Sequence, residues 1–509
     1  MYVLTAENMK KAEMRANEKG LTFDEMMERA GKGCAEKIFL KEKSGCESKK
    51  AVILAGKGKN GGDGLVIGRY LWKFGFKNIK VILVHGDVSD PLCFKMLASL
   101  AKYPVDIRDF KKNPDTCLSH INSADIIIDC IFGIGFKGVL EGVSAQAVSA
   151  ANANKCSKYA VDIPSGLTAD GAFDDNLYFH ADSTLSMIAF KPVHVLMPTA
   201  HFCGRTEVID IGVDGDDVTS FSEKYTSLTD AEAKQSLKPR RLESNKGDYG
   251  KILTVSGSRN MVGCVYLLNR AAVEIGAGLV TAAFPECIYN IAASKLNEPV
   301  FLPLPCEGGF ISDKAEKTLI EKLKVSTAAA IGCGLGVTEQ TKQIVKAVIE
   351  NAECPVVLDA DGINCIADNP QVLKNTKGNL VLTPHPGEMG RLCGKSIAEI
   401  QSDRMGIASE FAREYGVTLV LKGSNTVIAG SDGRISVNTT GNPGMARGGS
   451  GDVLTGIIAG LLPQTEDEFE AAQLGAYIHG KAGDCLAEKY NMSACTPTRL
   501  IDSLMYLDI

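Results

Sequence analysis

The sequence lacks long apolar runs and a strong charge imbalance, and each absence excludes a class of protein. No stretch of about 20 apolar residues occurs, which excludes a transmembrane helix. The 55 Lys and Arg residues oppose 61 Asp and Glu residues, for a net charge of −6, and no basic run suits a nucleic-acid backbone or a membrane surface. The N-terminus, MYVLTAENMKKAEMRANEKG, carries charges where the apolar segment of a signal peptide would lie. We therefore expect a cytoplasmic protein with no nucleic-acid or membrane partner.

Motifs for structural metals, disulfides and P-loop chemistry are also missing. The 16 cysteines form no C-x-x-C motif, and none of the seven histidines lies three or four residues from another. With no export signal, the cysteines are expected to be reduced thiols, and the histidine spacing argues against a dedicated zinc site. The Walker pattern G-x-x-x-x-G-K-[ST] is absent, which excludes ordinary P-loop chemistry. The chain is rich in glycine instead, with 52 in 509 residues.

Apolar runs alternate with helical patterns along the chain, which indicates parallel α/β units. The expected strands are 51–55, 80–85, 125–129 and 159–163, then 251–257, 278–283, 327–332, 355–360, 379–384 and 417–423. One expected helix has an apolar face made of Phe23, Met26, Met27, Ala30, Cys34 and Ile38. A polar, acidic segment, 212–230, separates two such series. We therefore expect an α/β protein of two doubly wound domains: a Rossmann-like three-layer sandwich over 1–215, a linker over 216–227, and a second domain over 228–509.

A glycine-rich loop at 56–64 follows the first expected strand and opens a helix. Gly56, Gly58 and Gly61 match G-x-G-x-x-G, and Asp87 follows the next strand, as in dinucleotide-binding domains. Glycines let the backbone approach a phosphate, and a helix N-terminus donates N–H groups to it. A tight strand-to-helix turn requires the same glycines for backbone reasons alone. Both interpretations remain open on this motif by itself.

Polar side chains lie in this loop and at two further strand ends. Asn60 and Asp63 add oxygens that a plain turn does not need, and Asp129, Asp162 and Ser165 follow later strands. An Asp in such a place is more often a cap or turn residue than a catalyst. The carboxyl ends of parallel strands meet at one edge of a sheet, however, where ligands bind. Hard oxygen atoms gathered there suit a cation.

These three segments resemble the NAD(P)H-hydrate epimerase family over roughly the first 215 residues. The motifs are G-x-G-x-N-G-G-D-G, D-x-I-F-G-x-x-x-K-G and V-D-I-P-S-G, in this order. That family interconverts the R and S forms of hydrated NADH and NADPH, which carry an added hydroxyl on the nicotinamide ring. The resemblance implies a potassium ion held by Asn60, Asp129 and Ser165, and places Asp162 at the reacting ring. It implies that the hydrate contacts Lys59, Asn60, Gly61, Gly62, Asp63, Gly133, Ile134, Gly135, Phe136, Lys137, Gly138, Val139 and Asp162.

Inversion of a carbon that bears both a hydroxyl and the ring nitrogen needs proton transfer and stabilisation of positive charge. A carboxylate at a strand end, such as Asp162, suits both tasks. Lys59 departs from the family pattern, which usually has two Asn residues at this place. Its ammonium would either contact the cofactor phosphate or repel the potassium ion. The later FAKP segment, 189–192, also resembles the family, but nothing assigns a role to its Lys191.

The second series contains the densest glycine motif of the chain, TTGNPGMARGGSGDVLTG at 439–456. Gly448, Gly449 and Gly451 cluster just before Asp452, at the start of an apolar helix. Backbone N–H groups at such a helix start bind an anion, and the Asp stands beside them. Phosphoryl transfer to an alcohol needs both parts, since the moving phosphate must be stabilised and the hydroxyl needs a base. The alternative is that Asp452 only caps the helix.

The G-G-x-G-D arrangement resembles the ribokinase-like superfamily, so the second domain is expected to be ribokinase-like. Further segments resemble, more narrowly, the NAD(P)H-hydrate dehydratase family over roughly 228–509. They are 244–258, 331–336, 358–364, 382–389 and 422–428. That family uses ADP or ATP to phosphorylate the ring hydroxyl of the S hydrate, after which phosphate leaves and NADH or NADPH is restored. Phosphate is a far better leaving group than hydroxide.

This second resemblance assigns roles to single residues. It makes Asp452 the base at the hydroxyl, and places Gly336 and His385 with Asp452 against the hydrate. The ADP or ATP site would comprise Lys422, Gly423, Ser424, Asn425, Thr426 and Gly451. Asp359 and Asp361 either contact magnesium through water or cap strand ends. Arg447 replaces a common Thr and would clamp a phosphate or point to solvent, and Asn245 stands where a His is usual.

The two resemblances together predict a bifunctional repair enzyme, because a fused epimerase supplies the epimer on which the dehydratase acts. We expect K+ in the epimerase domain, Mg2+ in the dehydratase domain, and ADP rather than ATP as donor, since the fusion resembles the prokaryotic arrangement. NADH-hydrate or NADPH-hydrate preference and a possible homo-oligomer stay open. One rival is a small-alcohol kinase of the hydroxymethylpyrimidine or thiazole type, which would accumulate a phosphorylated product. The other is a non-catalytic nucleotide-binding protein, which would tolerate Asp452→Asn.

Overall fold

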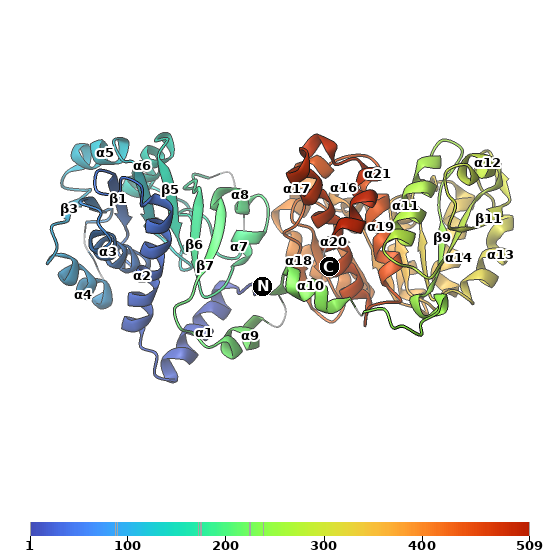
Figure 1. Cartoon of the computed structure of the whole chain (residues 1–509), viewed down its shortest axis with the longest axis horizontal. Coiled ribbons are helices and arrows are strands. Elements are labelled where there is room, and N and C mark those ends of the chain that lie inside the picture. The colour runs from blue at the N-terminus through green and yellow to red at the C-terminus, as the bar shows by residue number, and fades with distance from the viewer. Residues whose placement is uncertain are drawn as a thin grey trace. The chain divides into compact units, whose positions relative to one another are not determined.

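The computed structural model describes residues 2–86, 88, 90–171, 173, 176–222, 225–237 and 239–507. The chain divides into two compact units, Met1–Tyr225 and Thr226–Ile509. Each unit is built on a largely parallel sheet with helices beside it (Figure 1). The prediction of two doubly wound α/β domains is confirmed. In the described part of the chain, no helix combines the length and apolarity needed to cross a bilayer.

The first unit has seven parallel strands in the order β3-β2-β1-β4-β5-β6-β7. The strands are β1 (Lys50–Ala55), β2 (Asn78–Leu83), β3 (Asp106–Asp109), β4 (Ile126–Cys130), β5 (Ser157–Val161), β6 (Ser183–Met187) and β7 (Arg205–Ile209). The helices are α1 (Ala6–Glu18), α2 (Phe23–Glu42), α3 (Lys59–Lys73), α4 (Pro91–Leu100), α5 (Pro114–Asn122), α6 (Gly142–Ala153), α7 (Pro192–Val195), α8 (Thr199–Cys203) and α9 (Gly215–Ser222). The strand order reverses between β1 and β4, where ligands of such sheets bind.

Strand β1 shows why the central strands are apolar without a break. Ala51 and Ile53 belong to a core cluster with buried residues of α2, α3 and α4. Val52 and Leu54 belong to a second cluster, with residues of α5 and α6. Successive side chains of a strand point to opposite faces, so a strand covered on both faces must be apolar at every position. The predicted helix with the apolar face is α2, whose Thr22–Glu25 capping box fixes its start.

The segment expected to be a linker, 216–227, is instead partly folded onto the first unit. It contains most of α9, whose Asp217 is only 1% exposed. The Asp217 carboxylate lies 2.9 Å from Arg15 Nε and 2.7 Å from Lys19 Nζ, both on α1. The acidic composition suggested a linker, but the two cations balance the buried charge of Asp217. The segment also ends in strand β8 (Tyr225–Thr226).

We expect Asp217→Asn to loosen α1. The charge-assisted hydrogen bonds from Arg15 and Lys19 would be lost, which costs about 1–2 kcal/mol after allowing for the half-exposed cations. Hydrogen exchange of the α1 amides should become roughly 5–30 times faster. Asp216→Asn is the matched control, because Asp216 is exposed on the same helix. Equal effects from both variants would contradict the role given to Asp217.

The second unit has a sheet of order β11-β10-β9-β14-β15-β16-β17-β18-β19-β8, parallel from β11 to β17 and antiparallel over β17-β18-β19. Its further strands are β9 (Lys251–Val255), β10 (Leu279–Pro285), β11 (Val300–Leu304), β12 (Cys306–Glu307), β13 (Phe310–Ile311), β14 (Ala328–Ile331), β15 (Val356–Leu358), β16 (Leu380–Leu382), β17 (Thr418–Leu421), β18 (Val427–Ala429) and β19 (Ile435–Val437). Its helices are α10 (Asp230–Ser236), α11 (Val262–Glu274), α12 (Tyr289–Ala293), α13 (Glu316–Leu323), α14 (Glu339–Asn351), α15 (Asp361–Ile366), α16 (Pro386–Cys393), α17 (Ile397–Ser402), α18 (Arg404–Tyr415), α19 (Ser450–Leu461), α20 (Glu468–Lys489) and α21 (Pro497–Ser503). The order reverses between β9 and β14.

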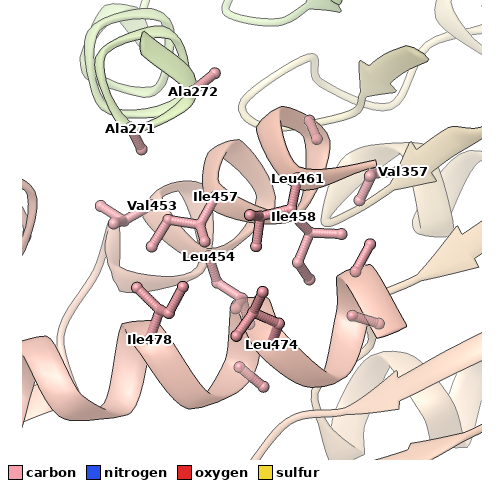
Figure 2. Close-up of a cluster of buried hydrophobic side chains, with 14 of the residues drawn as sticks. Ala271, Ala272, Val357, Val453, Leu454, Ile457, Ile458, Leu461, Leu474 and Ile478 are labelled. Atoms are coloured by element: carbon pink, nitrogen blue, oxygen red, sulfur yellow. The ribbon is translucent and has the colours of Figure 1, made fainter. Parts of the chain in front are cut away.

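Helix α19, which carries the dense glycine motif at its start, is fixed in the core of this unit. Figure 2 shows its apolar side chains between those of α11 and α20, with Val357 of β15 nearby. At Gly456 a Cβ would lie 2.3 Å from the carbonyl oxygen of Leu268, so only glycine permits this approach to α11. The core therefore fixes where the first turn of α19, with Asp452, is placed.

Candidate active sites

The first unit contains a cavity of about 830 Å³ at the carboxyl ends of β1, β4 and β5. Nine of the predicted hydrate contacts line it: Lys59, Asn60, Asp63, Gly133, Ile134, Gly135, Phe136, Lys137 and Asp162. Helices α1 and α2 complete the wall with Lys10, Glu13, Met14 and Phe23, which the sequence did not indicate. Gly61, Gly62, Gly138 and Val139 are not among the lining residues. Asp87, the acidic residue of the dinucleotide motif, lies outside the described residues.

Two glycines of the loop are required by the turn itself. A Cβ at Gly56 would lie 1.9 Å from the Ile131 carbonyl oxygen, and one at Gly61 would lie 2.0 Å from that of Gly56. Gly58, the N-cap of α3, has open space beside it. Backbone packing therefore accounts for Gly56 and Gly61, and Gly58 is the glycine of the motif that lines the cavity.

Asn60 and Ser165 are both buried and both bind the backbone of Phe132, and Ser165 in turn binds the buried Asp129. The Asn60 amide donates to the carbonyls of Phe132 (2.7 Å) and Val161 (3.1 Å), which leaves its buried Oδ1 without a hydrogen-bond partner. The Asp129 carboxylate accepts from the Ser165 hydroxyl at 2.7 Å and from the Ser165 N–H at 2.7 Å. Burial raises the pKa of Asp129 to about 6, against the hydrogen bonds that lower it. An unpartnered buried oxygen is what a bound cation would satisfy.

Asp162 lies at the end of β5, facing the cavity, in a strained conformation. Its φ is +69°, in the left-handed region that a non-glycine residue rarely adopts. Its Oδ2 accepts from the Ile134 N–H at 3.1 Å and its Oδ1 from Lys191 Nζ at 2.6 Å. Burial alone would raise the pKa of Asp162, but the Lys191 ammonium holds this pKa below its ordinary value. Asp162 is thus kept as a carboxylate.

Two more carboxyl groups in the cavity have raised pKa values, in contrast to Asp162. Burial raises the pKa of Glu13, and the Asp162 carboxylate raises it further. Burial also raises the pKa of Asp63, with Asp162 and Glu13 adding to the effect. Carboxyl groups whose pKa values are driven apart can divide the roles of proton acceptor and proton donor. The cavity therefore has the groups for acid–base chemistry.

Aromatic rings form part of the cavity wall. The rings of Phe132 and Phe136 lie 4.6 Å apart between centroids, and both residues line the cavity. The Lys59 ammonium lies 4.2 Å from the centre of the Phe23 ring, which is a cation–π contact. Flat apolar rings beside ammonium groups suit a ligand that has both a planar ring and phosphates.

In the second unit, the polar side chains gather at the ends of strands β14 to β17, around Asp359. This buried carboxylate accepts from Lys422 Nζ at 2.7 Å, Thr383 Oγ1 at 2.7 Å and Thr455 Oγ1 at 2.8 Å. Burial alone would raise the pKa of Asp359, but Lys422 and the two hydroxyls lower it overall. Asp359 is therefore the anchor of Lys422, a role that the sequence did not reveal.

Asp452 lies in the first turn of α19, close to Asp359. One side-chain atom each of Cys333, Asp359 and Asp452 lie within 4.8 Å of one another. Burial raises the pKa of Asp452, and the Asp359 carboxylate raises it further, against hydrogen bonds from the thiols of Cys264 and Cys333. A carboxylate with a raised pKa is a stronger base than an exposed one. Beside it, a Cβ built on Gly451 would lie 3.4 Å from Lys422 Nζ, so the ammonium adjoins the start of the helix.

His385 is linked to Lys422 through Glu388. His385 is the N-cap of α16, and its Nδ1 accepts from the Gly387 N–H at 3.0 Å. The buried Glu388 accepts from the His385 N–H at 2.7 Å, and its other oxygen lies 3.3 Å from His385 Nε2. The Lys422 ammonium is 3.8 Å from Glu388. The half-exposed imidazole is thus held beside the same cluster of charges.

Arg404 fixes the loop between β17 and β18, which contains Lys422 to Thr426. This buried guanidinium donates to the Ser424 carbonyl at 2.6 Å and to the Leu421 carbonyl at 3.0 Å. Gly423 has a φ of +152° and Asn425 a φ of +55°. The strain in this loop lies at Asn425, because glycine adopts a positive φ freely and other residues rarely do.

The remaining predicted residues have clear local partners. The Gly336 N–H donates to Asp361 at 2.8 Å, so Asp361 caps this turn. Arg447 donates to the Ser493 carbonyl at 3.1 Å, a structural contact for the residue that replaces the family's Thr. Asn245 is the N-cap of a 3₁₀ helix, Lys246–Tyr249.

Sequence reasoning missed several residues of these sites. Glu13 and Phe23 line the cavity, and Lys191 binds Asp162 from behind the cavity wall, all from elements that carry no glycine or strand-end motif. The FAKP segment was the signal for Lys191. Glu388 could have been found because it stands three residues after His385, in capping-box spacing. Arg404 gave no signal, since its partners are backbone carbonyls.

Comparison with known proteins matches both units. A family model described as NAD(P)H-hydrate dehydratase matches residues 252–505, and one described as YjeF-related protein N-terminus matches residues 23–193. The bifunctional NAD(P)H-hydrate repair enzyme Nnr of Moorella thermoacetica is 39% identical, over 100% of this chain and 96% of the relative. The protein of the same description from Escherichia coli is 33% identical, over 98% of this chain and 92% of the relative.

The solved structures that are similar include one that matches about half of this chain. It is the ADP/ATP-dependent NAD(P)H-hydrate dehydratase of Bacillus subtilis, co-crystallised with ATP and Mg2+. It is 32% identical, with a TM-score of 0.49, and the match covers 55% of this chain and 96% of that one.

Proposed function

The chain belongs to the family of bifunctional NAD(P)H-hydrate repair enzymes, and from this premise we propose that each unit performs one of the two reactions. The first unit, 1–225, interconverts the R and S hydrates of NADH or NADPH. The second unit, 226–509, dehydrates the S hydrate with ADP or ATP as phosphate donor. The observation that carries the assignment is the placement of Asp452 beside Lys422 at the glycine-rich start of α19.

In the first unit, Asp162 moves the proton during inversion. The inverted carbon bears a hydroxyl and the ring nitrogen, so both ring opening to a carbonyl and departure of the hydroxyl transfer a proton at that oxygen. Asp162 is a carboxylate facing the cavity, and Glu13 and Asp63 are the carboxyl groups with raised pKa values. The Phe132–Phe136 wall binds the planar part of the substrate, and the lysines of the cavity face its phosphates.

Potassium is assigned to the buried oxygen atoms of Asn60, Asp129 and Ser165. The fit rests on the unpartnered Asn60 Oδ1 and on the buried Asp129–Ser165 pair. A bound cation would stabilise the turn that carries Phe132 and Gly133 against the substrate. The Lys59 ammonium lies against the Phe23 ring and keeps its positive charge in the cavity.

In the second unit, Asp452 accepts the hydroxyl proton while the hydroxyl oxygen attacks the terminal phosphorus of the nucleotide. The new O–P bond forms as the bond to the departing nucleotide breaks, and the Lys422 ammonium and the N–H groups of the helix start balance the charge that moves. The C–O bond to phosphate then breaks, and a proton leaves the neighbouring ring carbon, which restores the double bond. Each step conserves atoms and charge without a redox partner.

Magnesium enters as part of the nucleotide substrate. The carboxylate of Asp359 already accepts from Lys422, Thr383 and Thr455, so it does not fit as a direct metal ligand. The nucleotide phosphates would hold the ion, with the loop at Lys422–Thr426 around them.

The test is recovery of reduced-nicotinamide absorbance from a mixture of R and S NADH hydrates, with Mg2+, K+ and either ADP or ATP. We expect complete recovery with one nucleotide, which identifies the donor. Recovery that stops when the S form is exhausted would remove the epimerase assignment and keep the dehydratase. A stable phosphorylated product without recovery would instead support a small-alcohol kinase.

The cation site makes a separate prediction. Epimerisation should rise and saturate with added K+, and Asn60→Ala should weaken the apparent K+ affinity about tenfold or more, because a ligand is lost. Asn113→Ala is the matched control, since Asn113 makes no side-chain cap to α5. Epimerisation that is equally fast in tetramethylammonium buffer would show that the site needs no potassium.

A further inference from the structure

Lys191 is a fully buried lysine with no assigned part in either reaction. Its side chain is 0% exposed, and its ammonium donates to Asp162 Oδ1 (2.6 Å), Ser186 Oγ (2.8 Å) and the Met187 carbonyl (2.9 Å). A buried ammonium is tolerated only when its N–H groups find acceptors. Here three N–H groups meet three acceptors, and the one that carries charge is Asp162.

The same segment also fixes the backbone of Asp162. The Asp162 N–H donates to the Leu185 carbonyl at 2.8 Å, and the Asp162 carbonyl lies 2.8 Å from His194 Nε2. The Lys191 N–H donates to His194 Nδ1 at 3.0 Å, so Nε2 of this imidazole is the donor to Asp162. Burial and the Lys191 ammonium lower the pKa of His194 to about 3, so the ring is neutral. Residues 185–194 thus fix both the backbone and the carboxylate of the strained Asp162.

The two oxygens of Asp162 face different surroundings. Oδ2 lies beside the turn at Gly133 and Ile134, which lines the cavity, and a Cβ on Gly133 would lie 3.0 Å from it. Oδ1 is bound by Lys191, which is not a lining residue. One oxygen is therefore available at the cavity while the other is taken by the ammonium.

We propose that Lys191 is a positioning residue of the epimerase site, which holds the Asp162 carboxylate so that Oδ2 faces the hydroxyl on the reacting carbon of the hydrate. This inference rests on the proposed epimerase function. Because Lys191 does not reach the cavity, it acts on the substrate only through Asp162. The competing explanation is that Lys191 serves only the stability of the fold.

The test compares Lys191→Met, Asp162→Asn and the double variant in the full-length chain, by separating R and S hydrates over time. We expect Lys191→Met to lower kcat of epimerisation by about 100-fold or more, as a misplaced catalytic group does, with an unchanged KM. In the double variant, the Lys191 change should add no further loss to that of Asp162→Asn. Lys155→Met, at an exposed position, is the control and should epimerise at the wild-type rate.

Losses that multiply in the double variant, or a raised KM with unchanged kcat, would overturn the proposal. If Lys191→Met fails to fold, Ser186→Ala decides instead, because it removes one acceptor and keeps the charge. We expect Ser186→Ala to lower kcat about tenfold at constant KM, and unchanged kcat would count against positioning. A wild-type chain that does not epimerise would reject the proposed epimerase function itself. A Lys191→Met variant that epimerises at the wild-type rate would reject only the positioning role of Lys191.

Discussion

We expect Asp452→Asn to lower kcat for dehydration of the S hydrate about 10²–10⁴-fold, which is the usual contribution of a general base. An amide cannot accept the hydroxyl proton, while its size is that of the carboxylate. Nucleotide binding should persist, because Lys422 keeps its contact with Asp359. The measurement is single-turnover formation of reduced nicotinamide from purified S hydrate, with nucleotide affinity determined on the same variant.

The same chain provides the controls for this result. Epimerisation of R to S by the Asp452→Asn variant should equal that of the wild type, since Asp452 lies in the other unit. Asp368→Asn, in which the changed side chain is 85% exposed, should dehydrate normally. Dehydration by Asp452→Asn at the wild-type rate would show that Asp452 only caps the helix and is not the base.

Much of the fold and of both candidate sites was predictable because parallel strands end at one edge of their sheet. The apolar strands were found where both faces are covered, as in β1 and β4, and their ends led directly to Asp129, Asp162 and Asp359. Strands without an apolar run were missed. β3 (DIRD) and β6 (STLSM) are examples. Their residues pair with neighbouring strands, but their sequences contain no continuous apolar run.

The residues that escaped prediction have partners far away in the sequence. Asp217 meets Lys19, 198 positions earlier, so its burial could not be inferred from the acidic segment around it. Glu13 enters the cavity from α1, and Lys191 reaches Asp162 after the chain has passed through another strand. Such contacts arise from tertiary packing, whereas caps and strand ends leave a local pattern.

Two of the positions with a strained backbone are predicted site residues. The non-glycine residues with positive φ in the described ranges are Asp162, Ile188, Ala360 and Asn425. Asp162 and Asn425 were predicted site residues, and Ala360 lies between Asp359 and Asp361. A strained backbone conformation persists only where neighbouring residues hold it in place. Such strained residues are typical of active sites. At Asp162, the neighbouring residues that hold the conformation are Lys191, which binds its carboxylate, and His194, which binds its carbonyl.

Asp162→Asn should nearly abolish epimerisation, with a fall in kcat of about 10²-fold or more, and leave dehydration of purified S hydrate unchanged. The amide no longer accepts the proton, and it leaves the buried Lys191 ammonium without its carboxylate partner. The variant is therefore also expected to be destabilised by about 3 kcal/mol, the cost of an unpaired buried charge. Thermal unfolding of the first unit, followed together with R-to-S conversion, separates the two effects.

Two comparisons make this last result decisive. Asp115→Asn, at an exposed position in the first turn of α5, should change neither stability nor rate. The double variant with Lys191→Met removes both buried charges and should recover stability without recovering epimerisation, because stability depends on charge balance and inversion depends on a proton acceptor. Equal loss of both enzyme activities in Asp162→Asn would contradict the assignment of the epimerase to the first unit.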